Sequence, residues 1–195
     1  MSGYILVVTG GMFSGKSEQL IERCKKFQKY GKKNVIVYKP SSDNRFSSDE
    51  VVSRMGYHFP ATNIPENITD EVMDRILKET EKVEVVGFDE AQFYSKNIMK
   101  LVGELAYRGK YVIVAGLNMD YRGREFGYMG GLLAMADEII RLHSFCAVCG
   151  SERGTHTQRL VNGKPAKKGS PIVLIGDTES YEPRCRNCFI PPEKA

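Results

Sequence analysis

The 195-residue sequence contains no tryptophan, only three histidines and no uninterrupted apolar stretch that approaches the length of a membrane span. A transmembrane helix needs about 20 mostly apolar residues, so we expect no membrane partner. The histidines, His58, His143 and His156, fall in no spacing typical of a metal site or a nucleophile–base pair. Residues 1–3 lead directly into the first apolar run, which leaves no room for a leader peptide. The expected location is therefore the cytoplasm.

A strong charge excess is also lacking, because 28 basic and 24 acidic side chains give a formal net charge of +4. This mild charge suits a protein that handles anionic nucleotides, but it is too weak to predict a nucleic-acid partner. In a reducing compartment the five cysteines are not expected to form disulfides. They therefore need another explanation.

The residues at 10–17 fit the pattern G-x-x-x-x-G-K-S/T, which is typical of the phosphate-binding loop of nucleoside triphosphatases and related kinases. An apolar run precedes the motif, and apolar residues at helical spacing follow it as far as Gly31. This context favours a phosphate cradle over a chance glycine-rich turn, because backbone N–H groups and a helix N-terminus together bind phosphate oxygens. Lys16 is predicted to reach the β- and γ-phosphates, and Ser17 to bind Mg²⁺.

A second apolar run, at residues 83–88, ends in the acidic pair Asp89 and Glu90, as a Walker B strand does. Asp89 is predicted to assist Mg²⁺, and Glu90 could accept a proton from an attacking nucleophile. An apolar run followed by two acids is a weak signal alone and gains its meaning from the phosphate-binding loop. The residues expected to bind ATP are Thr9, Gly10, Gly11, Met12, Phe13, Ser14, Gly15, Lys16, Ser17, Asp89 and Gln92.

Two polar loops follow other predicted strands, at residues 39–46 and 116–124. Ligands of open α/β sheets bind beyond the carboxyl ends of the strands. Asp43 could therefore bind Mg²⁺, and Arg45 could contact a phosphate. The alternative is that the first loop is an ordinary solvated turn. Two arginines and a tyrosine in the second loop suit phosphate and base recognition, although an exposed basic loop has the same composition.

Apolar strand patterns alternate with helical ones up to about residue 142, which predicts an α/β fold with a parallel sheet flanked by helices. Beyond that point, a C-x-x-C pair at Cys146 and Cys149 is answered by a second at Cys185 and Cys188. Four thiolates at this spacing are the ligand set of a structural Zn²⁺ site. We predict a nucleotide-binding domain at residues 1–142 and a small zinc-stapled domain at residues 143–195.

The combination of these motifs resembles the type II thymidine kinases, which are zinc-containing kinases of the phosphate-binding-loop class. The matching segments cover nearly the whole chain and are residues 11–17, Lys39-Pro40 with Asp43 and Arg45, residues 88–93, residues 116–118 and 120–123, both cysteine pairs and Tyr181. The resemblance implies transfer of the ATP γ-phosphate to the 5′-hydroxyl of thymidine, with deoxyuridine as a further substrate. It also implies a homotetramer inhibited by thymidine triphosphate.

The resemblance further implies individual roles for residues. Glu90 matches the general base, Asp43 and Asp89 match acids that organise Mg²⁺ together with Ser17, and Arg45 matches an arginine that contacts phosphate. A "lasso" between Cys149 and Cys185 is expected to close over the nucleoside and exclude water. The residues implied to bind the nucleoside are Met12, Phe93, Leu117, Tyr121, Leu174, Ile175, Gly176 and Tyr181.

Two other functions fit parts of the pattern. A nucleic-acid-dependent ATPase would use Glu90 to activate water and the cysteines to build a zinc ribbon. The modest charge and the lack of a basic, aromatic-rich stripe in the zinc segment argue against it. A nucleotide sensor without turnover would have no need of a base at Glu90.

Overall fold

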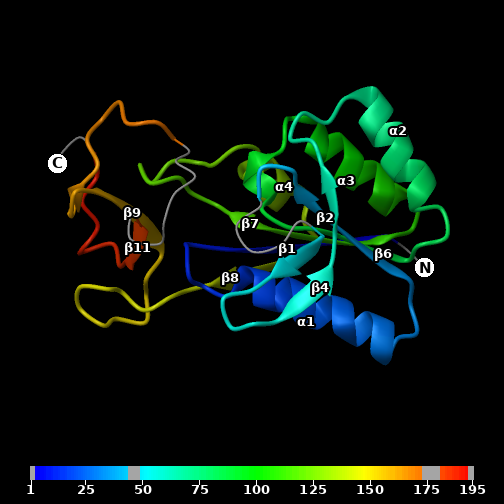
Figure 1. Ribbon diagram of the computed structural model, residues 1–195, viewed down its shortest axis with the longest axis horizontal. Coiled ribbons are helices and arrows are strands. Elements are labelled where there is room, and N and C mark those ends of the chain that lie inside the picture. The colour runs from blue at the N-terminus through cyan, green and yellow to red at the C-terminus, as the bar shows by residue number, and fades with distance from the viewer. Residues whose placement is uncertain (1–2, 44–48, 173–180, 193–195) are drawn as a thin grey trace.

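The computed structural model of the chain describes residues 3–43, 49–172 and 181–192, and its centre is a six-stranded sheet with the order β5-β2-β6-β7-β1-β8 (Figure 1). The strands are β1 (Tyr4–Gly10), β2 (Val35–Pro40), β5 (Thr62–Ile64), β6 (Val85–Phe88), β7 (Tyr111–Leu117) and β8 (Glu138–Leu142). Every neighbouring pair in this sheet is parallel. The carboxyl ends of these strands therefore meet at one edge, and the predicted α/β fold is confirmed.

Helices cover both faces of the sheet, with α1 on one side and α2 and α3 on the other (Figure 1). The helices are α1 (Lys16–Lys29), α2 (Asp70–Glu79), α3 (Asn97–Tyr107) and α4 (Met129–Met135), and the short 3₁₀ helix η1 is Ala91–Phe93. Within the described part of the chain, none of the helices combines the length and apolarity that crossing a membrane requires.

The two apolar layers explain why the central strands are continuous apolar runs. In β1, Leu6 and Val8 pack with Leu20 and Cys24 of α1, whereas the neighbouring residues face the other layer. Ile5 and Val7 pack there with Ile76 of α2 and Leu101 of α3. Successive strand side chains point to opposite faces, so a strand covered on both sides is apolar at every position.

Three short strands near the sheet carry little signal in the sequence. β3 (Glu50–Val52) and β4 (His58–Pro60) form an antiparallel pair, and β5 adds to the edge of the sheet beside β2. Strands of three residues are too short to show a periodicity.

The C-terminal part of the chain, from residue 143 onward, forms the end of the molecule away from the N-terminus (Figure 1). It contains a three-stranded antiparallel sheet, β10-β9-β11, made of β9 (His156–Val161), β10 (Lys164–Pro165) and β11 (Tyr181–Arg184). Asn162 and Gly163 join β9 to β10 with positive φ angles of 52° and 72°. A two-residue Asn-Gly hairpin turn needs this conformation at both positions.

Candidate functional site

The phosphate-binding motif lies where β1 ends and α1 begins. Helix α1 starts at Lys16, so the glycine loop stands on a helix N-terminus, the arrangement suited to binding an anion. Lys16 Nζ and Ser14 Oγ each donate a hydrogen bond to the carbonyl oxygen of Gly11, both at 2.8 Å. At Gly10 a Cβ atom would lie 2.4 Å from the carbonyl oxygen of Leu142, so only glycine fits there.

The remaining loop residues anchor the loop or line its outer side. The Thr9 hydroxyl donates to the Gly116 carbonyl oxygen at 2.9 Å and thereby ties the end of β1 to β7. Gly15 has a φ of 84°, and Phe13 is a non-glycine residue with a φ of 63°. Phe13 is 37% exposed, with the Arg54 guanidinium 4.3 Å from its ring centroid. The ATP-binding role of these residues stays a prediction.

Ser17 and Asp89 are brought together across the edge of the sheet. The Ser17 hydroxyl donates to Asp89 Oδ2 at 3.1 Å, although the two residues are 72 positions apart. Asp89 follows β6 directly and is buried. Burial, and then the negative charge of Glu90, raises the pKa of Asp89. A buried carboxylate beside a second one favours a cation, so these residues fit the proposed binding of Mg²⁺.

Glu90 adopts a left-handed backbone conformation, with φ 46° and ψ 42°, and is half-buried. Such a conformation costs a non-glycine residue of the order of 1 kcal/mol or more and is concentrated at functional sites. Gln92 holds the carboxylate in place, because its Nε2 donates to Glu90 Oε2. The other end of the same amide, Oε1, accepts a hydrogen bond from the backbone N–H of Leu117 at 2.9 Å.

Gln92 therefore links the predicted base to the predicted nucleoside pocket. Its side chain is 2% exposed, and both ends of its amide are occupied by protein partners. This geometry indicates a positioning role, and the predicted contact of Gln92 with ATP stays a prediction.

The aromatic residues predicted to line the nucleoside pocket belong to two groups. Phe93 makes an edge-on contact with Phe126, with ring centroids 5.6 Å apart. Tyr121 is buried, and its hydroxyl donates to the Ser170 carbonyl oxygen at 2.8 Å. The Arg159 guanidinium lies 5.5 Å from the Tyr121 ring centroid and 6.0 Å from that of Tyr181. Tyr121 and Tyr181 therefore share Arg159 as a neighbour.

The C-terminal part of the chain contacts the phosphate-binding loop through Met12. The Met12 backbone N–H donates to Thr157 Oγ1 at 3.1 Å, and the Ser144 hydroxyl donates to the Met12 carbonyl oxygen at 3.2 Å. Thr157 and Arg159 are two positions apart in β9, so their side chains share one face of that strand. That face turns toward the loop and Tyr121.

The remaining predicted site residues are Asp43, Arg45 and residues 174–176. Asp43 is half-buried just after β2, and its negative charge contributes to raising the pKa of Asp89. This places it within electrostatic reach of the predicted Mg²⁺ ligands. Arg45, Leu174, Ile175 and Gly176 lie outside the described residues, so their predicted roles stay predictions.

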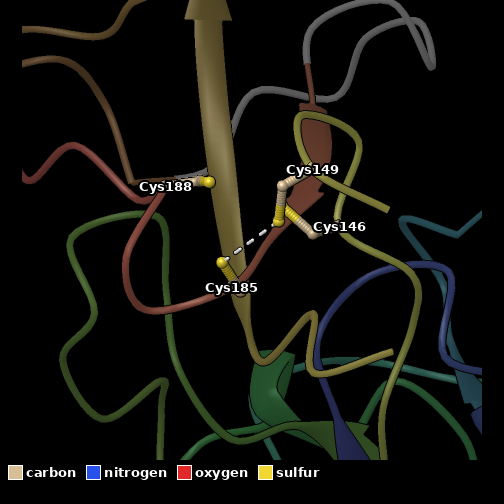
Figure 2. A group of neighbouring side chains, drawn as sticks. All are labelled: Cys146, Cys149, Cys185 and Cys188. Atoms are coloured by element: carbon tan, nitrogen blue, oxygen red, sulfur yellow. Dashed lines mark hydrogen bonds between the residues drawn. The ribbon is translucent and has the colours of Figure 1, made fainter. Parts of the chain in front are cut away.

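The four cysteines predicted to bind zinc converge, two from each C-x-x-C pair (Figure 2). All four sulfur atoms lie within 4.8 Å of one another, and Cys149 Sγ is 3.7 Å from Cys185 Sγ. A tetrahedral Zn²⁺ with Zn–S distances of about 2.3 Å separates its sulfurs by about 3.8 Å. The cluster could therefore hold a structural metal ion, and its geometry is consistent with zinc.

The local backbone also favours thiolates. Backbone N–H groups around Cys188 lower the pKa of the Cys185 thiol. Burial by itself would raise the pKa of Cys146, but hydrogen bonds from the backbone near Cys185 and Cys149 lower it to about 6. Metal binding requires deprotonated sulfur, so these N–H groups favour the metal-binding form of Cys146 and Cys185. Hydrogen bonds with the neighbouring cysteines act in the opposite direction at Cys188 and raise the pKa of its thiol to about 12.

The thymidine kinase family model matches residues 3–189 of this sequence, which is nearly the whole chain. The chain belongs to the thymidine kinase family. Among solved structures, domain III of the Thermotoga maritima replication initiation protein DnaA is similar at 15% sequence identity and a TM-score of 0.42. That match covers 72% of this chain, and the chain spans about half of the other one, at 55%.

Three residues near the site were missed from the sequence. Thr157 and Arg159 belong to β9, where no motif marks them and only their place on one strand face brings them to the loop. Arg159 is 3% exposed, and its Nε has no hydrogen-bond partner among the described residues. A buried cation with an unpaired N–H group favours an anionic or polar ligand.

The third missed residue is Tyr94, which is 2% exposed and whose hydroxyl has no hydrogen-bond partner among the described residues. Tyr94→Phe should therefore leave the free energy of unfolding unchanged or raise it by about 1 kcal/mol, because an unpaired buried hydroxyl is removed. Tyr38→Phe is the matched control, since the buried Tyr38 hydroxyl donates to Glu79 at 3.0 Å. Urea denaturation of both variants measures the difference. An equal loss of stability in both would mean that a buried water satisfies Tyr94.

Proposed function

We propose that this protein transfers the γ-phosphoryl group of ATP to the 5′-hydroxyl of thymidine, giving thymidine monophosphate and ADP. The observation that carries the proposal is the family match over residues 3–189. The geometry supports it, because a phosphate-binding loop, the Ser17–Asp89 contact and the half-buried Glu90 share one edge of the sheet.

In this mechanism Glu90 is the general base. Its carboxylate takes the proton of the 5′-hydroxyl as the oxygen of that group forms a bond to the γ-phosphorus. The bond between the γ-phosphorus and the β–γ bridging oxygen breaks, and ADP leaves. Gln92 would hold the carboxylate in the direction of the nucleoside, since it already bonds both Glu90 and the Leu117 backbone.

The phosphates of ATP would lie against the glycine loop, residues 10–15, with the Lys16 ammonium group at the β- and γ-phosphates. Lys16 Nζ bonds the loop carbonyl of Gly11, so binding ATP would exchange that partner for phosphate oxygens. Ser17 and Asp89, with Asp43 nearby, would hold Mg²⁺. When bound, Mg²⁺ supplies positive charge that offsets the charge of the phosphate oxygens.

The nucleoside would lie between the sheet edge and the C-terminal part of the chain, near Met12, Phe93, Leu117, Tyr121 and Tyr181. Arg159 extends this set, because its guanidinium group is near both tyrosine rings and its Nε–H has no hydrogen-bond partner among the described residues. The backbone of residues 174–176 would contact the base. Under this proposal residues 143–195 act as a separate lasso domain that closes over residues 1–142 and keeps water from the phosphoryl group.

Finer properties follow from the same proposal. The cysteine cluster would carry Zn²⁺ as a structural ion, because four protein ligands leave no open position for catalysis. The proposed function has four further parts. The protein would assemble as a homotetramer and would be inhibited by thymidine triphosphate. It would act in the cytoplasm and would have no nucleic-acid partner. Strand β8 supports self-association, since it lies at the sheet edge and Ile139 in it is 50% exposed.

The test is ATP consumption with Mg²⁺ present, with and without thymidine, combined with chromatographic identification of the products. We expect thymidine monophosphate to appear one-for-one with ADP, and little ADP without thymidine. ADP release that only single-stranded DNA stimulates would favour the motor function instead. ATP binding that no nucleoside or polynucleotide converts into turnover would favour a sensor.

A further inference from the structure

A cavity of about 490 Å³ lies on the side of β9 that faces away from the phosphate-binding loop. Its walls include Arg122 and Gly123 from the loop after β7, His156 from β9, and Arg186, Asn187 and Phe189 from the second cysteine pair and the residue after it. Two arginines and an aromatic ring therefore meet in one cavity that the proposed kinase chemistry leaves unused.

The alternation of side chains along β9 separates this cavity from the nucleoside site. Thr157 and Arg159 contact Met12 and Tyr121 on one face of the strand. His156 and Gln158 occupy the other face, where Gln158 exchanges two hydrogen bonds with the backbone of Ile190. The cavity is thus behind the strand as seen from the phosphate-binding loop.

One wall of the cavity is a stacked pair of aromatic rings. The rings of His156 and Phe189 are stacked, with centroids 4.7 Å apart and planes inclined by 28°. Gly123 lies close against this pair, because a Cβ atom at that position would be 3.5 Å from the Phe189 ring and 3.8 Å from His156. Burial, and then the charge of Arg186, lowers the pKa of His156, so its imidazole is a neutral ring at pH 7.

The rim of the cavity carries positive charge. Arg122 is held by Asp120, with its Nε 2.7 Å and one terminal nitrogen 2.6 Å from Asp120 Oδ2, which directs the guanidinium group. Arg186 is exposed, and over residues 3–43, 49–172 and 181–192 no carboxylate forms an ion pair with it. The amide of Asn187 adds both a donor and an acceptor beside it.

We propose that this cavity binds a small phosphate monoester that carries a planar ring. The phosphate would lie between Arg186 and Arg122, because a guanidinium group matches phosphate oxygens in geometry and charge. The ring would stack on the face of Phe189 that His156 does not cover, because aromatic pairs with centroids about 4.5–7 Å apart are favourable. This site is independent of the proposed phosphoryl transfer and does not depend on its success.

The experiment uses the full zinc-loaded chain, with the other sites saturated by Mg²⁺, a non-hydrolysable ATP analogue and thymidine. Isothermal titration at low ionic strength then measures binding of inorganic phosphate and of phenyl phosphate. We expect one additional ligand per chain, with phenyl phosphate bound about fivefold more tightly because its ring adds a stacking contact of about 1 kcal/mol. Equal affinities would overturn the ring assignment, and no additional binding would overturn the site.

Two variants test the named residues. Arg186→Gln should weaken phenyl phosphate binding about tenfold by removing a charge-assisted contact, and Asn187→Asp should weaken it at least as much by placing a negative charge in the cavity. Arg153→Gln is the matched control, because Arg153 is an exposed arginine of the same C-terminal part of the chain outside the cavity walls. Equal weakening in the control would mean diffuse charge attraction and would contradict the proposal.

Arg186 follows Cys185 directly, so its positive charge could instead stabilise the negatively charged thiolates of the cysteine cluster. Zinc content measured on each variant separates these roles. The proposal requires Arg186→Gln to keep its metal while it loses phosphate binding. If Arg186→Gln and Asn187→Asp each lose zinc together with phenyl phosphate binding, the proposal is overturned.

Discussion

Replacing Glu90 with glutamine should lower the rate of thymidine phosphorylation by about a hundred- to ten-thousand-fold, the range expected when a general base is lost. Glutamine has nearly the same shape and can still accept the hydrogen bond that Gln92 donates to Glu90. It cannot take the proton of the 5′-hydroxyl. Affinity for the ATP analogue should change little, because the phosphate-binding loop is untouched. Steady-state turnover and calorimetric binding measure the two quantities separately.

The control for this variant is Glu81→Gln, which removes the same charge from an exposed position after α2. Its turnover should match that of the unchanged protein. Turnover of Glu90→Gln within threefold of the unchanged protein would show that another group accepts the proton.

Replacing Cys185 with serine should remove bound zinc and abolish activity, although the residue lies outside the proposed reaction centre. Structural Zn²⁺ in small zinc-binding peptides contributes about 10–16 kcal/mol of apparent binding free energy, so losing one thiolate is costly. The antiparallel pair β9–β11 ends at Cys185, with Arg184 opposite His156. Without the metal, we expect this pair to open.

The loss of activity would follow from the contacts that β9 makes. Thr157 holds the Met12 backbone of the phosphate-binding loop, and Arg159 lies near the rings of Tyr121 and Tyr181. Opening of β9 would release all of them, while the parallel sheet keeps its own two apolar layers. Hydrogen exchange should therefore rise in residues 156–161 and stay low in β1 and β7.

Zinc content, turnover and hydrogen exchange are measured together on Cys185→Ser and on Cys24→Ala. Cys24 is buried in α1 and outside the cysteine cluster, so its variant should keep one zinc ion per chain. A Cys185→Ser protein with full zinc content would contradict the four-thiolate site. A zinc-free protein with unchanged turnover would contradict the dependence of the active site on β9.

The parallel sheet was predictable because its central strands are apolar at nearly every position and each stands between a turn and a helix. The strands β1, β2, β6, β7 and β8 were all expected from such runs. β5 and β11 were not, because Thr62–Ile64 and Tyr181–Arg184 contain no apolar run, and such a segment forms a strand only when a neighbouring strand offers its hydrogen bonds. Their pairing is a property of the assembled chain.

Three features of the candidate site could be predicted from the amino-acid sequence alone: the glycine-rich motif at residues 10–17, the acidic pair Asp89 and Glu90 at the end of a buried strand, and the four cysteines that converge in the fold. These are local signals, since a fixed spacing of glycines, acids or thiols is enough to indicate the chemistry. Other contacts form only when the chain folds: Ser17 meets Asp89, Gln92 bonds both Glu90 and Leu117, and Arg159 comes close to the rings of Tyr121 and Tyr181. Each of those contacts except that of Gln92 with Glu90 joins residues more than 20 positions apart, and no local pattern specifies which side chains will meet when the elements pack.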